Sequence, residues 1–147
     1  IEFRQDAYLD SGYIANQEQK MEIYRRLAAI EDEKTLTDLI DEVIDRFGTP
    51  SQPSEKLFRI SEIRVKARHL GIGSIIDEGD SLLVTWADES FMHGWDPMKL
   101  PKTWLPYLKF LPGSPAKLRI HKALIKGTMT DWMADFMDEL KRETGKQ

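Results

Sequence analysis

The sequence predicts an α+β fold, in which an N-terminal strand and a helical first half pack on a small, mainly antiparallel sheet closed by a C-terminal amphipathic helix. Apolar residues recur at helical spacing between residues 16 and 70, at alternate positions from residue 72, and at helical spacing again after residue 128. A chain of 147 residues buries about 68–70% of the surface of its unfolded state, enough for one core. We therefore expect a single domain over residues 1–147.

The first predicted element is a half-buried strand. Residues 1–9, IEFRQDAYL, alternate between a mostly apolar side and a polar side. The chain begins inside this pattern and without a methionine. We therefore expect it to be a piece of a longer protein.

Three helices are predicted next. The first starts near Asn16 and has an apolar stripe of Ile23, Leu27 and Ile30, with Arg25 and Arg26 facing water. The second has the most regular helical pattern in the chain, formed by Leu36, Leu39, Ile40, Val43, Ile44 and Phe47. Gly48 and Pro50 predict its end, because glycine adopts left-handed backbone and proline cannot continue a helix.

The third helix is expected to start after Pro53, with Ser54 as its candidate N-cap, and to run to Leu70, where Gly71 ends it. Its apolar residues fall into two stripes, so we expect contacts on two of its sides. Arg64 and Arg68 lie between the stripes.

The second half of the chain predicts strands and one more helix. Residues 72–79 and 81–87 form a candidate hairpin around an acidic turn, and residues 117–124 form a further strand. The proline-rich region 95–115 predicts short turns at most. Residues 128–143 predict a terminal helix with Thr128 or Thr130 as its cap.

These patterns also predict the core. The residues expected to be largely buried are Phe3, Leu27, Leu39, Val43, Phe47, Ile60, Ile63, Val84, Ile120 and Phe136, because each lies on the apolar stripe of its element.

Composition narrows the classes of function. The chain has no cysteine, which excludes disulfides and thiolate metal sites and favours a cytoplasmic origin. No apolar run approaches the roughly 20 residues of a membrane helix. The net charge of −4 argues against a dedicated nucleic-acid module, which usually carries a basic surplus, and favours a basic or polar protein partner.

No motif predicts catalysis or cofactor binding by this chain. His69, His93 and His121 lack metal-ligand spacing, and no serine or threonine stands in a nucleophile elbow. The acidic cluster at residues 77–80 is interpreted as a solvated turn, with a cation loop as the alternative. The motif LGIGS at 70–74 follows a helix and lacks the lysine of a phosphate loop, so it is interpreted as a helix end.

The outward side of the second helix is acidic. Its cluster consists of Asp38, Asp41, Glu42 and Asp45, with Arg46 at the edge, and no i, i+4 partner is expected to compensate it. Two interpretations remain open at this point: a solvated helix face, or a docking surface for a basic partner.

Three segments resemble a known family. QKMEIYRRLAAI (19–30), LIDEVIDRFGTP (39–50) and ISEIRVKARHLGI (60–72), with WMADFMDELK near the end, are similar in order and spacing to the C-terminal domain of bacterial transcription-repair coupling factors. The resemblance covers essentially the whole chain. The family pattern often has two prolines after Arg-Phe-Gly, whereas this chain has TPSQP, and region 95–115 also departs from it.

The resemblance implies a parent that is an ATP-driven DNA translocase, using ATP and Mg²⁺. Such a parent binds stalled RNA polymerase and double-stranded DNA, and recruits the excision-repair A subunit through a module similar to the excision-repair B subunit. The C-terminal domain packs on that module and masks it, which is autoinhibition, and has no motor motif itself. The motif E-x-x-D-R-F-G places Glu42, Asp45 and Arg46 in this contact, and Asp38 and Asp41 would add longer-range steering.

Two other classes remain as alternatives. A nucleic-acid-binding accessory domain would bring Arg64, Arg68 and nearby lysines onto one basic surface. An uncharacterised enzyme would have a deep polar pocket with strongly perturbed titrating groups. On the preferred hypothesis the chain is a monomeric protein-interaction domain with no membrane partner.

Overall fold

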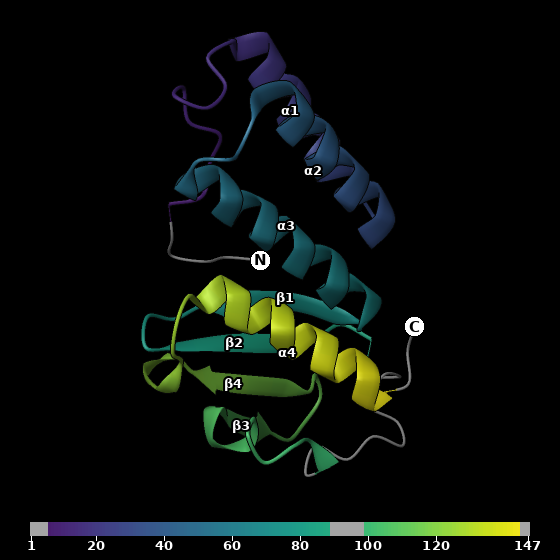
Figure 1. The fold of residues 1–147 in the computed structure, drawn as a ribbon. Helices are drawn as coiled ribbons and strands as arrows, with labels where there is room; N and C mark the ends of the chain where they lie inside the picture. Colours follow the sequence, from purple (N-terminus) through teal and green to yellow (C-terminus); the bar gives the residue numbers. More distant parts are fainter. Residues whose placement is uncertain (1–5, 89–98, 145–147) are drawn as a thin grey trace. The chain divides into compact units, whose positions relative to one another are not determined.

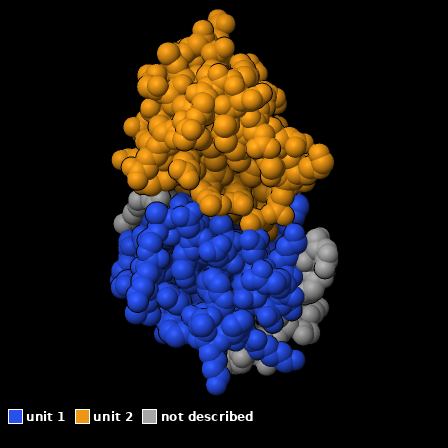
Figure 2. All heavy atoms as spheres, in the orientation of Figure 1, with its two compact units in different colours: residues 1–4, 67–147 blue, residues 5–66 orange. Residues whose placement is uncertain are grey.

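The structure, a computed structural model, describes residues 6–88 and 99–144. The chain divides into two compact units, residues 5–66 and residues 1–4 with 67–147 (Figure 2). The expectation of one domain over residues 1–147 therefore stays a prediction. The α+β class is confirmed, because the described chain contains helices at both ends and a four-stranded antiparallel sheet.

The unit of residues 5–66 is helical (Figure 1). It contains α1 (Gln17–Ala29), α2 (Glu33–Phe47) and most of α3 (Gln52–His69). Its core is formed by Leu9, Ile14, Ile23, Leu27, Ile30, Leu36, Leu39, Val43, Phe58 and Val65. Each of the larger side chains stabilises the fold by about 1.5–3 kcal/mol through burial, so the apolar stripes hold these helices together.

Local capping fixes where the helices begin. Asn16 accepts a hydrogen bond from the backbone N–H of Gln19 (3.0 Å), and Asp32 accepts one from that of Thr35 (2.8 Å). α2 ends at Gly48, whose φ of 85° and ψ of −166° are accessible mainly to glycine. The prediction of Ser54 as the cap of α3 was wrong, because the helix begins at Gln52 and Ser54 is buried inside it.

The N-terminal stretch is tied to the helical unit without forming a strand in its described part. Residues 6–9 have no strand pairing, yet Leu9 is buried and Tyr8 is exposed, as their alternation predicted. The backbone N–H of Leu9 donates to the Tyr24 hydroxyl (2.7 Å). Residues 1–5, including Phe3, lie outside the described residues.

The other unit is a sheet with one long helix. Strands β1 (Ile72–Asp77), β2 (Ser81–Trp86), β3 (Leu108–Leu111) and β4 (Lys117–His121) are antiparallel in the order β1-β2-β4-β3. The 3-10 turns η3 (Leu105–Tyr107) and η4 (Lys122–Leu124) flank β3 and β4, and α4 (Met129–Thr144) runs across the sheet (Figure 1). Thr128 caps α4, accepting from the N–H of Asp131 (3.3 Å).

Strand β3 is the element that the sequence did not predict. It lies inside the proline-rich region, between Pro106 and Pro112, and pairs with β4 through four registered residues. Both prolines fall outside the strand, so neither removes a ladder hydrogen bond. The expectation of turns only was therefore wrong for residues 108–111.

The acidic turn between β1 and β2 is also different from the prediction. The Asp77 side chain is fully buried and accepts from the Lys122 ammonium at 2.8 and 3.0 Å and from the N–H of Gly79 at 2.9 Å. A solvated turn was therefore the wrong interpretation for Asp77, because this carboxylate is part of the fold.

Most of the predicted core is confirmed. Seven of the ten residues are buried: Leu27, Leu39, Val43, Ile63, Val84, Ile120 and Phe136. Phe47 and Ile60 are half-buried. Phe47 packs edge-on against Tyr13, with ring centroids 6.2 Å apart.

Candidate docking surface on α2

Helix α2 holds all five predicted site residues on its polar side. Leu39 and Val43, on the opposite side of the helix, are buried in the core. Asp41 and Asp45 are exposed, and among the described residues neither has an ion-pair or hydrogen-bond partner for its side chain. These two carboxylates are therefore available to a partner.

The rest of the cluster is compensated, contrary to the prediction. Asp38 lies 3.1 Å from the Lys34 ammonium, one helical turn earlier. Glu42 is inclined toward α1 and accepts two hydrogen bonds from Arg26, at 2.5 and 2.9 Å. Arg26, expected to face water, bridges the two helices instead.

Arg46 closes this network. Its guanidinium lies 3.4 Å from Glu42 and 3.8 Å from Glu22, and its central carbon lies 5.0 Å from the Phe47 ring centroid. The side chains of Glu42 and Arg46 are 41% and 35% exposed, so both remain accessible. Arg46 is thus held in place before any partner arrives.

The network changes the titration of its members. The two hydrogen bonds from Arg26, and then its positive charge, hold the pKa of Glu42 below its usual value. The same hydrogen bonds raise the pKa of Arg26. Glu42 therefore stays ionised to lower pH than an isolated glutamate.

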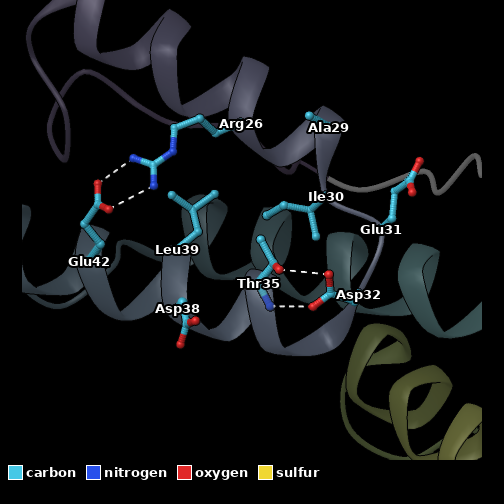
Figure 3. Close-up of a pocket in the computed structure, with 9 residues that line it drawn as sticks. All are labelled: Arg26, Ala29, Ile30, Glu31, Asp32, Thr35, Asp38, Leu39 and Glu42. Carbon is cyan, nitrogen blue, oxygen red and sulfur yellow. Dashed lines mark hydrogen bonds and ion pairs between the residues drawn. The ribbon is translucent and has the colours of Figure 1, made fainter.

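A groove adjoins this network (Figure 3). It has a volume of ≈ 460 Å³ and is lined by Arg26, Ala29, Ile30, Glu31, Asp32, Thr35, Asp38, Leu39 and Glu42. Figure 3 shows the Arg26–Glu42 bridge at one end of it and the Asp32–Thr35 cap at the other. Asp38 and Glu42 belong to both the groove and the acidic cluster, so the rim of the groove is partly acidic.

At the positions where the sequence predicted them, the described residues offer less to the alternative classes. Arg64 donates to the carbonyls of Leu27 (2.6 Å) and Ile30 (3.5 Å), so it closes the end of α1 and forms no basic surface. Among residues 6–88 and 99–144, no three His, Asp or Glu side chains gather as a metal site requires. No helix in that part of the chain is both long and apolar enough to span a membrane.

Comparison with known proteins identifies the family. The model of the TRCF domain family matches residues 3–94. The chain belongs to this family. It is 40% identical over 85 residues to the transcription-repair-coupling factor of Staphylococcus haemolyticus and 42% identical over 84 residues to that of Staphylococcus epidermidis. The matches cover 58% and 57% of the chain but 7% of each of those proteins.

A solved structure supports the fold over the rest of the chain. The crystal structure of the C-terminal domain of a transcription-repair coupling factor superposes with a TM-score of 0.79, covering 99% of this chain and 93% of that one. Sequence identity is 19%, so this likeness establishes the fold. Together with the family match, it confirms the resemblance drawn from the sequence.

Proposed function

We propose that the chain is the C-terminal regulatory domain of a transcription-repair coupling factor and acts as an autoinhibitory mask. The α2 docking surface, defined as Asp38, Asp41, Glu42, Asp45 and Arg46, would cover a module of the parent similar to the excision-repair B subunit. While covered, that module would not recruit the excision-repair A subunit. The chain would bind its partner within the parent and carry out no chemistry of its own.

On this proposal, the ATP-dependent reaction takes place in other parts of the parent. There an ATP- and Mg²⁺-dependent translocase on double-stranded DNA would release lesion-stalled RNA polymerase. Engagement of polymerase and DNA would shift the mask off the module and couple transcription to nucleotide excision repair. The strength with which this domain docks would determine how readily the module is uncovered.

One observation carries the proposal. Among the residues that the structure describes, Asp41 and Asp45 are exposed and have no partner, and they lie beside Arg46, which Glu42 and Glu22 already hold in place. A preorganised charged surface loses little side-chain entropy on binding. It also steers a basic partner, which affects association rate and specificity more than affinity.

A mask also has to release. Coupling between two sites is typically worth ~1–3 kcal/mol, and a contact made largely of exposed charges fits that range better than an apolar interface. The half-exposed Glu42 and Arg46 suit such a releasable contact.

The direct test is binding of the 147-residue chain to the isolated repair module by calorimetry. Glu42→Ala/Asp45→Ala/Arg46→Ala should weaken binding by a factor of about 30 or more, because truncating interfacial charge pairs costs roughly 2–5 kcal/mol. Asp135→Ala on α4 is the control, since it is exposed and makes the same change in net charge. Equal binding by all three proteins would reject the α2 surface.

The excision-repair A subunit supplies the second arm of this test. Added to the preformed complex, it should displace the chain from the module if the two share one site. Formation of a ternary complex would contradict masking even if the α2 surface does bind the module.

A further inference from the structure

The chain contains a long stretch without acidic residues. Between residues 97 and 130 there is no Asp or Glu, while the basic residues are Lys99, Lys102, Lys109, Lys117, Arg119, Lys122 and Lys126. The chain as a whole has a net charge of −4. Positive charge is therefore concentrated in the part that forms β3 and β4.

The sheet register brings three of these cations together. Lys109 on β3 lies directly opposite Arg119 on β4, and Lys117 lies two residues before Arg119. Residues two apart on a strand point to the same face of a sheet. Lys109, Lys117 and Arg119 therefore form one basic face.

In the part of the chain that the structure describes, that face is the more exposed side of the sheet. In the alternating set, Ile75, Val84 and Leu118 are 0% exposed. By contrast Lys109 is exposed, and Lys117 and Arg119 are half-exposed. One side of the sheet therefore belongs to the core, and the side that carries the three cations belongs to the surface.

Neighbouring strands add hydroxyl groups to the basic face. Lys117 is paired with Thr85 of β2, which is paired in turn with Ser74 of β1. The apolar members of the same two rows are Ile76, Leu83 and Leu111. No aromatic residue belongs to these rows in the described strands.

The charges on this face are only partly compensated. Glu78 lies 3.6 Å from Arg119. Among the described residues Lys109 and Lys117 have no ion-pair partner. Like charges directly opposite on antiparallel strands destabilise the pairing. An anion bound over Lys109 and Arg119 would therefore add to the compensation that Glu78 gives on the Arg119 side.

We propose that this basic face, Lys109, Lys117 and Arg119, binds the phosphate backbone of double-stranded DNA. Lysine, arginine and hydroxyl side chains are the groups that contact phosphates. Single-stranded nucleic acid needs aromatic stacking platforms, which this face lacks.

This inference is independent of the proposed mask. It concerns residues 109–119, whereas the mask concerns α2, so either can fail alone. It also qualifies the argument from net charge, because local placement of cations, and not their total, decides phosphate contact.

The test measures binding of the whole chain to a fluorescein-labelled 20-base-pair duplex by anisotropy, at salt concentrations from about 50 to 200 mM. Three phosphate contacts give a slope of about −2.7 in log K against log salt, or a roughly 40-fold loss across that range. Lys109→Gln/Lys117→Gln should leave a slope of about −0.9 and a loss of only about 3.5-fold.

Two further variants make the result specific to this face. Lys102→Gln/Lys126→Gln removes the same charge from exposed positions outside the strands and should keep the wild-type slope. Glu78→Gln frees Arg119 and should tighten binding. Equal losses in both lysine pairs, or no change with Glu78→Gln, would overturn the proposal.

Poly-glutamate of matched charge tests the other class of partner. Failure of the duplex to bind at 50 mM salt, together with poly-glutamate binding that Lys109→Gln/Lys117→Gln abolishes, would assign the face to an acidic protein. That outcome would also overturn the proposal.

Discussion

Two acidic clusters in this chain look alike in sequence and behave differently in the structure. In α2, Asp41 and Asp45 stay exposed and unpaired among the described residues. In the β1–β2 turn, Asp77 is fully buried against Lys122, which lies 45 residues away in the sequence. Asp41 and Asp45 of the first cluster are available to a partner, whereas Asp77 of the second is used by the fold.

The difference comes from the elements beside each cluster. A helix with one apolar stripe leaves its polar side in water unless another element covers it. A hairpin turn at the end of a sheet is reached by the neighbouring strand, and here β4 leads directly into Lys122. Acidic composition alone therefore does not distinguish a docking surface from a structural ion pair.

The largest effect is expected from breaking the buried pair. Lys122→Met should lower the free energy of unfolding by about 3–5 kcal/mol, because it leaves the Asp77 carboxylate buried without its cation. Urea unfolding measures this, with exposed Lys126→Met as the control. A loss below about 1 kcal/mol would mean that Asp77 is not stabilised by Lys122.

The end of α2 should be the next most sensitive position. Gly48→Ala should lower the free energy of unfolding by about 1–3 kcal/mol, because the glycine adopts backbone angles that a side chain strains. Thr49→Ala, at the exposed neighbouring position, serves as its control. A neutral Gly48→Ala would show that α2 can end differently without loss.

The pH dependence of stability should distinguish Glu42, which is paired with Arg26, from Asp41 and Asp45, which have no partner among the described residues. The folded-state pKa of Glu42 is lowered, chiefly by hydrogen bonds from Arg26. A lowered carboxylate pKa gives stability that is present above the unfolded value, about 4.3, and is lost as pH falls through the folded value. Unfolding free energy should therefore fall below about pH 4.3 and change little above about pH 5.

A double-mutant cycle tests whether the Arg26–Glu42 pair causes this pH dependence of stability. Glu42→Gln and Arg26→Gln should each flatten the same part of the curve, and the double variant should flatten it no further. Additive effects of the two substitutions would show that they act on separate interactions.

The smallest effect on stability is expected at the free carboxylates. Asp45→Ala should change the free energy of unfolding by no more than about 0.5 kcal/mol, as surface substitutions usually do. A larger loss in the same urea experiment would mean that Asp45 has a structural role. Asp45 would then resemble Asp77, which the fold uses, and not a residue that is available to a partner.

Much of the fold could be predicted because it depends on local pattern. Helical periodicity and the Asn16 and Gly48 boundaries predicted α1 and α2, and alternation predicted the β1–β2 hairpin. Strand β3 could not be predicted, because four residues between two prolines become a strand only by pairing with β4.

The site was predicted in part for the same reason. Periodicity placed Asp41 and Asp45 outward, where the structure has them. The bridge from Glu42 to Arg26 joins residues 16 apart on two helices, so it depends on how α1 packs on α2. The five residues of the docking surface remain predictions as partner contacts, since only a partner can test them.

The most direct test of masking is binding of the excision-repair A subunit by the parent protein in the absence of stalled polymerase. With Glu42→Ala/Asp45→Ala/Arg46→Ala the parent should bind the A subunit without polymerase, while wild type and Asp135→Ala should not. Thermal melting of the chain should stay close to wild type in both variants. Unchanged A-subunit binding with an unchanged melt would contradict the role of the α2 docking surface in autoinhibition.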